Sequence, residues 1–189
     1  DGGAMDIARL DNLLLELTDS ERAYCAGARY DWNDAFRQGQ QADIDGRHVR
    51  KIGNAAYALH QEGMPEGLSI VRNSRFNPVP EHVHDYVEIS YVYRGSAPQV
   101  VNGTQLTLAQ NEVLLLDAAC PHAVGELGEH DLMLSIVISR PMLRRSLEQS
   151  LSSTSAVSQF LLNALNDETD HRGHVHFRTG ASRRVRRYI

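Results

Sequence analysis

Short β-type segments separated by turn signals dominate the chain between about residue 49 and residue 139. Residues 86–93 are rich in Val, Ile and Tyr, and residues 112–116 and 131–139 are nearly continuous apolar runs. Asn102-Gly103 lies between two further β-type runs and is typical of a tight hairpin, because both residues accept positive φ. Many short strands at such spacing predict a sandwich or a barrel rather than a parallel sheet.

The apolar periodicity becomes helical on both sides of this β region. Apolar residues recur at helical spacing over residues 6–17, whereas residues 18–48 fit either an irregular arm or short helices. Beyond Ser139, Pro141 suits a first helical turn, and a second helical stripe follows the Ser/Thr cluster at 153–155. Such stripes show that a face is buried but not its partner, so they can pack on the barrel or on another subunit.

These patterns divide the chain of 189 residues into three parts. We expect an N-terminal helix and irregular arm over residues 1–48, a β-barrel over 49–139, and a helical dimerisation or linker segment over 140–189. A last helix capped by Ser182 stops in mid-pattern at Ile189, so we expect more of the protein to follow.

Composition narrows the class of protein. No run of about 18 apolar residues is present, so we expect no membrane span, and the N-terminus lacks a secretion pattern. Cys25 and Cys120 have no disulfide or metal-knuckle spacing and fit the reducing cytoplasm. The net charge of −5 argues against a nucleic-acid surface on the body of the protein.

Three histidines and a glutamate form the most informative polar set. His82 and His84 share strand parity with Glu88, and His122 follows much later. On a straight strand His82 and Glu88 would lie roughly 20 Å apart, too far for one metal with bonds near 2 Å. If they share an ion, the chain must bend between them, and Asp85-Tyr86 is the natural corner. His122 would then come from another strand across the barrel.

A purely structural role is the alternative for each of these residues. Histidines beside a strand can be satisfied by backbone hydrogen bonds, and Glu88 could pair with Arg72 or Arg94. The tail histidines are expected at the surface, beside a short strand over His174 to Phe177.

The spacing His82-x-His84, then Glu88, then Gly95 resembles the first conserved motif of the cupins. Phe76 stands where that motif has a glycine. The second cupin motif is reduced to His122, because Asn111-Glu112 replaces its Gly-Asp.

More specifically, residues 76–140 resemble the N-terminal effector domain of AraC-type transcription regulators. The run from Pro80 to Gly95, the hairpin at Asn102-Gly103 and the stretch that ends at His122 carry this resemblance. It implies a mainly β fold, a cupin-like β-barrel (double-stranded β-helix) followed by C-terminal α-helices. It further implies a small-molecule effector in the barrel, a homodimer, and DNA binding only through a C-terminal domain beyond Ile189.

We therefore predict an effector-sensing and dimerisation domain with no catalytic residue. The side chains expected to face the ligand are His82, His84, Tyr86, Glu88, His122 and Arg72. The competing prediction is a small metal-dependent cupin enzyme, a dioxygenase or an isomerase. In it His82, His84, Glu88 and His122 would bind Zn, Fe, Mn or Ni, with positions left open for a substrate.

Overall fold

The computed structural model describes residues 7–29, 41–44, 47–52, 64–148, 156–166 and 172–178. The predicted cap at 153–155 and the predicted last helix from Ser182 lie outside these residues. Among the helices that the model describes, none combines the length and the apolar character needed to cross a bilayer.

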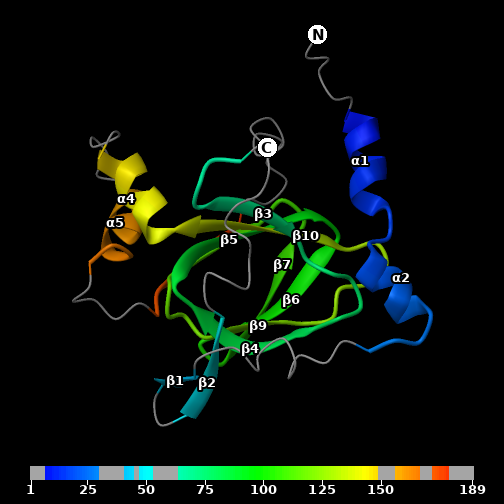
Figure 1. The fold of residues 1–189 in the computed structure, drawn as a ribbon, viewed down its shortest axis with the longest axis horizontal. Helices are drawn as coiled ribbons and strands as arrows, with labels where there is room; N and C mark the ends of the chain where they lie inside the picture. The colour runs from blue at the N-terminus through cyan, green and yellow to red at the C-terminus, as the bar shows by residue number, and fades with distance from the viewer. Residues whose placement is uncertain are drawn as a thin grey trace.

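Two sheets face each other and enclose the core (Figure 1). The first has the order β1-β2-β4-β9-β6-β7 and the second the order β11-β8-β5-β10-β3. The strands of the first sheet are β1 (Gln41–Ile44), β2 (Arg47–Ile52), β4 (Val79–His84), β9 (His122–Val124), β6 (Ser96–Val101) and β7 (Thr104–Ala109). Those of the second are β11 (His174–Phe177), β8 (Val113–Leu116), β5 (Tyr86–Arg94), β10 (Leu132–Ser139) and β3 (Leu68–Arg72). Neighbouring strands are antiparallel, except that β2 runs parallel to β4.

The strand predictions are confirmed over the β region. β5, β8 and β10 cover the three runs predicted from the sequence, and β11 is the short strand expected at His174–Phe177. Asn102 and Gly103 turn β6 into β7 with φ values of 50° and 74°, as the hairpin signal requires. β1 is a strand that the sequence pattern did not indicate. It lies within residues 18–48, which also contain the short helix α2 (Asp19–Cys25).

A single residue, Asp85, separates β4 from β5 and carries the chain from one sheet to the other. The predicted bend is therefore present at the expected corner. Because β5 starts again at Tyr86 in the opposite sheet, Glu88 returns toward the histidines of β4 instead of moving away along one strand.

The apolar core lies between the sheets. Inward-facing side chains alternate along β6 and β10, as they do in strands with one buried face. The main cluster comprises Val92, Ala97, Val101, Leu108, Leu114, Leu116, Cys120, Val124, Leu127 and Met133. Full burial of each large member is worth roughly 1.5 to 3 kcal/mol, so this cluster fixes the strands that carry the polar residues.

Helices cover opposite ends of the two sheets (Figure 1). α1 (Ile7–Leu15) and α2 lie at one end, and α4 (Arg140–Glu148) and α5 (Ala156–Asn163) at the other. Leu143 of α4 and Ala164, just after α5, pack with Val87 of β5, with Ile138 against the cluster. The sequence left open whether the apolar faces of these helices pack on the barrel or on another subunit, and in the structure they pack on the barrel.

Candidate functional site

The end of β4, the start of β5 and the start of β9 bring the predicted polar residues together. In the register of the sheet His82 pairs with His122, so His122 lies on the strand next to β4. The prediction that it comes from across the barrel was wrong, because β9 and β4 are neighbours in one sheet. Glu88 reaches the histidines from the opposite sheet.

His84, Glu88 and His122 form the tightest group. Their potential ligand atoms all lie within 4.8 Å of one another, and all three side chains are buried. Glu88 Oε2 is 3.4 Å from His84 Nε2 and 3.8 Å from His122 Nε2. His82 lies beside them, its ring centroid 4.1 Å from that of His122, but it is not part of this group of three.

A small cavity lies beside this group, and its lining includes His82, Glu88 and His122 but not His84. The cavity measures about 10 Å³, which is close to the room that a single water molecule needs. Its polar lining consists of Asn73 and Ser135 together with three residues predicted from the sequence, His82, Glu88 and His122. Its walls are formed by Val71, Asn73, Val79, His82, Glu88, His122, Val124, Ser135 and Val137. An organic ligand in this space would require side chains to move.

Backbone carbonyls set the tautomers of two histidines. His82 Nδ1 lies 2.9 Å from the carbonyl oxygen of Pro80, and His122 Nδ1 lies 3.0 Å from that of Cys120. A carbonyl only accepts hydrogen bonds, so each Nδ1 carries the proton and each Nε2 keeps a lone pair. This is the orientation that metal-binding histidines usually have.

Burial and mutual charge set the protonation states at neutral pH. Burial lowers the pKa of His122 to about 4, with Glu88 acting against this change, so His122 is neutral. Burial, together with the neighbouring His122 and His84, also lowers the pKa of His82 well below its usual value. For Glu88 burial acts to raise the pKa, but interactions with His84, His122 and Ser135 outweigh it, and the carboxylate stays ionised.

These residues satisfy three conditions for holding a divalent metal. Imidazole and carboxylate are ligands of Zn, Fe, Mn and Ni, and they bind in deprotonated forms, which the lowered pKa values of His122 and Glu88 favour. Ligand atoms with bonds near 2.1 Å to one ion lie about 3 to 4 Å apart, as Glu88 does from both histidines. Finally, both nitrogens of His84 and Nε2 of His122 are buried without a hydrogen-bond partner among the described residues. His84, Glu88 and His122 would hold the ion.

Two predicted ligand-facing residues, Tyr86 and Arg72, belong neither to the group of three potential metal ligands nor to the lining of the cavity. Tyr86 is fully buried and stacks on His84, with ring centroids 4.0 Å apart, so it supports that histidine from outside the lining of the cavity. Arg72 turns to the N-terminal helices, where it binds Glu21 at 2.9 Å. The structure therefore does not bring Arg72 to the cluster.

Sequence reasoning missed Asn73 and Ser135, which line the cavity with the predicted residues. Ser135 is the one hydroxyl inside the apolar run from Leu132 to Ile138, and this interruption was a readable signal. Asn73 follows the end of β3 without any comparable pattern.

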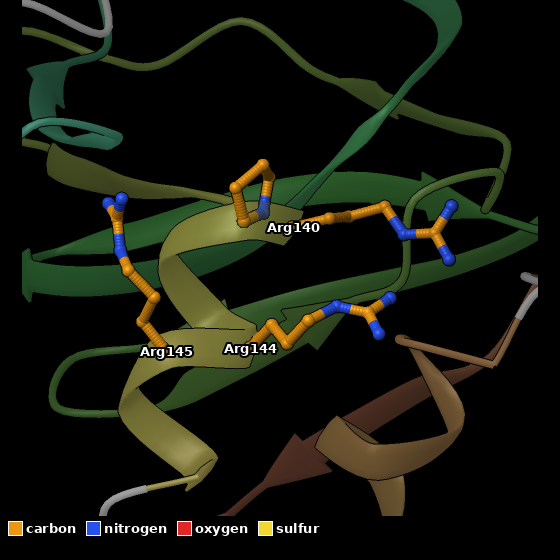
Figure 2. Close-up of a pocket in the computed structure, with 4 residues that line it drawn as sticks. Arg140, Arg144 and Arg145 are labelled. Atoms are coloured by element: carbon orange, nitrogen blue, oxygen red, sulfur yellow. The ribbon is translucent and has the colours of Figure 1, made fainter.

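A second hollow of about 450 Å³ lies open on the surface of α4 (Figure 2). It is lined by Arg140, Pro141, Arg144 and Arg145, and the side chains of Arg140 and Arg144 extend the same way from the helix. No residue lines both this hollow and the central cavity. Its guanidinium groups suit an anion, in contrast to the central cluster, which suits a cation.

Comparison with known proteins agrees with the resemblance seen in the sequence. The model of the family described as the AraC-like ligand binding domain matches residues 71–176. No curated protein matches the chain.

Solved structures with a similar arrangement include proteins of several kinds. A predicted oxalate decarboxylase from Thermotoga maritima is 23% identical, with 38% of this chain and 64% of that chain covered and a TM-score of 0.33. A cupin superfamily protein from Desulfitobacterium hafniense is 21% identical over 38% and 65%, with a TM-score of 0.34. A DMSP lyase from Ruegeria pomeroyi is 22% identical over 43% and 44%, with a TM-score of 0.36. In each comparison the chain spans less than two thirds of the other protein, and nothing about chemistry follows from similarity at this level.

Proposed function

Because the chain belongs to the family of AraC-like ligand-binding domains, we propose that it is the effector-sensing and dimerisation domain of an AraC-type transcription regulator. Its effector site is the cavity between the two sheets, whose polar groups come from His82, Glu88 and His122, with His84 behind them. The other parts of the chain keep the roles expected from the sequence. Residues 1–48 are an N-terminal arm, residues 49–139 a double-stranded β-helix barrel, and residues 140–189 a dimerisation and linker segment.

One observation carries this proposal: a buried, ionised carboxylate lies beside His84 and the neutral imidazole of His122, and both nitrogens of His84 and Nε2 of His122 have no hydrogen-bond partner among the described residues. Buried polar groups are nearly always satisfied, so a site left in this state favours a ligand that completes it. A divalent cation fits without rearrangement, because the potential ligand atoms of His84, Glu88 and His122 lie within 4.8 Å of one another. A larger effector would enter only if the lining moved, with a cationic or donor group placed next to Glu88.

Binding at this site can change DNA binding only through a difference in affinity between two conformational states. α4 and α5 are well placed to differ between such states, because they pack on Val87 and Ile138, and Val87 is the residue next to Glu88. A change in β5 would therefore reach the helices to which we assign the subunit contact. DNA would be bound by a C-terminal domain that lies beyond this chain.

The test uses the chain stripped of metal with a chelator and then titrated with Zn²⁺, Ni²⁺ or Mn²⁺. Thermal melting reports binding, and light scattering after gel filtration reports the mass. We expect a dimer whose melting temperature rises with one of these ions. His84→Ala combined with His122→Ala should remain folded and dimeric but lose the response. A monomer under all conditions, or an equal response in the double variant, would contradict the proposal.

A metal-dependent cupin enzyme is the second candidate, favoured by the ligand set of His84, Glu88 and His122. Three protein ligands leave coordination positions open, and a bound metal there would supply Lewis-acid or oxygen chemistry. His82 would face the substrate from the wall of the cavity. Metal-dependent turnover of any candidate substrate that is lost on His122→Ala would support the enzyme. If the metal raises the melting temperature but no substrate is turned over, the result supports the effector-sensing function.

A further inference from the structure

The segment between β3 and β4 contacts two parts of the protein in opposite directions. On its outer side, Arg75 binds Glu21 of α2 through its backbone N–H, Nε and Nη2, at 2.8, 3.0 and 2.9 Å. Arg72 binds the same carboxylate at 2.9 Å. Phe76, which has a φ of 70°, stacks on Tyr24 of α2 with ring centroids 5.6 Å apart. These contacts dock α2 on the segment.

On its inner side, Asn73 reaches the wall of the central cavity. Its Nδ2 donates to Ser135 Oγ at 2.8 Å, and its backbone N–H donates to the carbonyl of Met133 at 3.0 Å. Asn73 and Ser135 both line the cavity that contains Glu88. The segment from Arg72 to Phe76 is therefore fixed to α2 and to the site at the same time.

Ser135 completes the connection to the carboxylate. Ser135 and Glu88 lie on the neighbouring strands β10 and β5 and line the same cavity, and hydrogen bonding from Ser135 acts to lower the pKa of Glu88. Ser90 Oγ also donates to Glu88 Oε1 at 3.1 Å. An ionised carboxylate only accepts, and Ser135 Oγ already accepts from Asn73, so the hydroxyl proton of Ser135 points to Glu88. The order of donation is thus Asn73 to Ser135 to Glu88.

We propose that Ser135 and Asn73 are positioning residues for Glu88, and that α2, docked through Glu21, sets the affinity of the central site by holding Asn73 in place. This inference rests on the proposed ligand site at Glu88. Outer partners that orient metal ligands typically change metal affinity by about 10- to 100-fold when they are removed. Here the outermost partner belongs to an N-terminal helix rather than to the barrel.

The experiment measures Zn²⁺ affinity by calorimetry and the visible absorption of bound Co²⁺ in the full chain. Ser135→Ala and Asn73→Ala should each weaken Zn²⁺ by about tenfold and alter the Co²⁺ spectrum. Glu21→Gln should weaken Zn²⁺ by about fivefold, the lower end of typical coupling between sites. Because coupling is reciprocal, Zn²⁺ should also slow amide exchange in α2 of the wild type but not of Asn73→Ala.

Two controls separate positioning from general effects. Asp19→Asn removes a carboxylate from the same helix, and this carboxylate is fully exposed and pairs only with Arg22 among the described residues, so affinity should not change. Leu108→Ala opens a cavity in the core on β7 and should lower stability without changing the Co²⁺ spectrum.

The possible outcomes are distinct. If the wild type binds neither Zn²⁺ nor Co²⁺, the proposed metal site fails and this inference falls with it. If it binds and the Ser135, Asn73 and Glu21 variants bind equally well, the site stands and the inference is overturned. Unchanged affinity in Glu21→Gln alone overturns the role of α2. Equal weakening in Leu108→Ala also overturns the inference, because lost stability would then explain the data.

Discussion

Glu21 and Glu88 are both buried glutamates, but their surroundings differ in one decisive respect. Glu21 is fully buried and accepts hydrogen bonds from Arg75, from Arg72 and from the backbone of Thr18. Its partners are permanent cations and N–H groups, so its charge is compensated within the protein. Glu88 lies beside His84 and the neutral imidazole of His122, and nitrogens of both histidines remain without a hydrogen-bond partner among the described residues.

The difference separates a structural ion cluster from a binding site. A buried charge with complete partners holds two parts of a protein together, and removing one partner leaves the other uncompensated. A buried carboxylate that is hydrogen-bonded by hydroxyl groups and lies beside nitrogens with unused lone pairs has no guanidinium partner, and a cationic ligand can take that place. Glu21 and Glu88 are the same residue type and are both buried, so what distinguishes them is whether guanidinium groups of the protein already pair with the carboxylate.

The largest expected effect is on stability when Glu21 is neutralised. Glu21→Gln leaves the buried guanidinium of Arg75 without its carboxylate, which costs about 3 to 5 kcal/mol. Glu88→Gln leaves no guanidinium without its carboxylate and should cost clearly less. Urea denaturation of both variants checks this contrast, and Asp19→Asn should stay within about 0.5 kcal/mol of wild type. Equal losses for Glu21→Gln and Glu88→Gln would break the distinction.

Acid should destabilise the protein by protonating Glu21, which forms an ion cluster with Arg72 and Arg75 (the Glu21 cluster). Burial acts to raise the pKa of Glu21, but the hydrogen bonds from Arg75 and Thr18 outweigh it and lower the pKa from 4.5 to about 2. Because the folded pKa is lowered, the stabilisation is present above pH 4.5 and is lost as the pH falls toward 2. Its full size is about 3 kcal/mol. Stability of the wild type and of Glu21→Gln should therefore converge as the pH falls through this range. If the difference in stability between the two proteins stayed constant over this pH range, a group other than Glu21 would cause the loss of stability in acid.

Metal should stabilise the protein only through the central cluster. A ligand specific to the folded state at about 100 times its Kd adds about 2.7 kcal/mol, and a chelator should reverse the gain. Glu21→Gln should keep most of this increment even though its starting stability is lower. His122→Ala should show none of it. Differential scanning calorimetry with and without Zn²⁺ makes the comparison, and a gain that persists in His122→Ala would place the metal elsewhere.

The smallest expected effect concerns Phe76, which holds a left-handed backbone conformation next to the Glu21 cluster. Phe76→Ala and Phe76→Gly both lose the stacking on Tyr24, but only alanine keeps a Cβ at positive φ. The glycine variant should be more stable than the alanine variant by roughly 0.5 to 1 kcal/mol. Thermal melts of the pair resolve such a difference. If alanine were the more stable, the backbone at this position would not be strained.

Much of the fold follows from local patterns. Apolar alternation and the Asn102-Gly103 turn depend on neighbouring residues alone, so β5 to β8 and β10 were predictable. The corner at Asp85 also followed, because no single straight strand can bring His82 and Glu88 to one ion. The strand β1 was missed, since the alternation of polar and apolar residues over only four positions is too short to stand out from a loop.

The residue types of the site were likewise set by the sequence: His82, His84, Glu88 and His122 share a spacing that a metal or ligand site requires. Only the tertiary structure decided that His122 lies beside β4, that Arg72 binds Glu21, and that Asn73 and Ser135 complete the wall of the cavity. The reason is physical. Strand parity and turn chemistry act between neighbours in the chain, whereas the partner of a long polar side chain depends on which strands and helices meet in space.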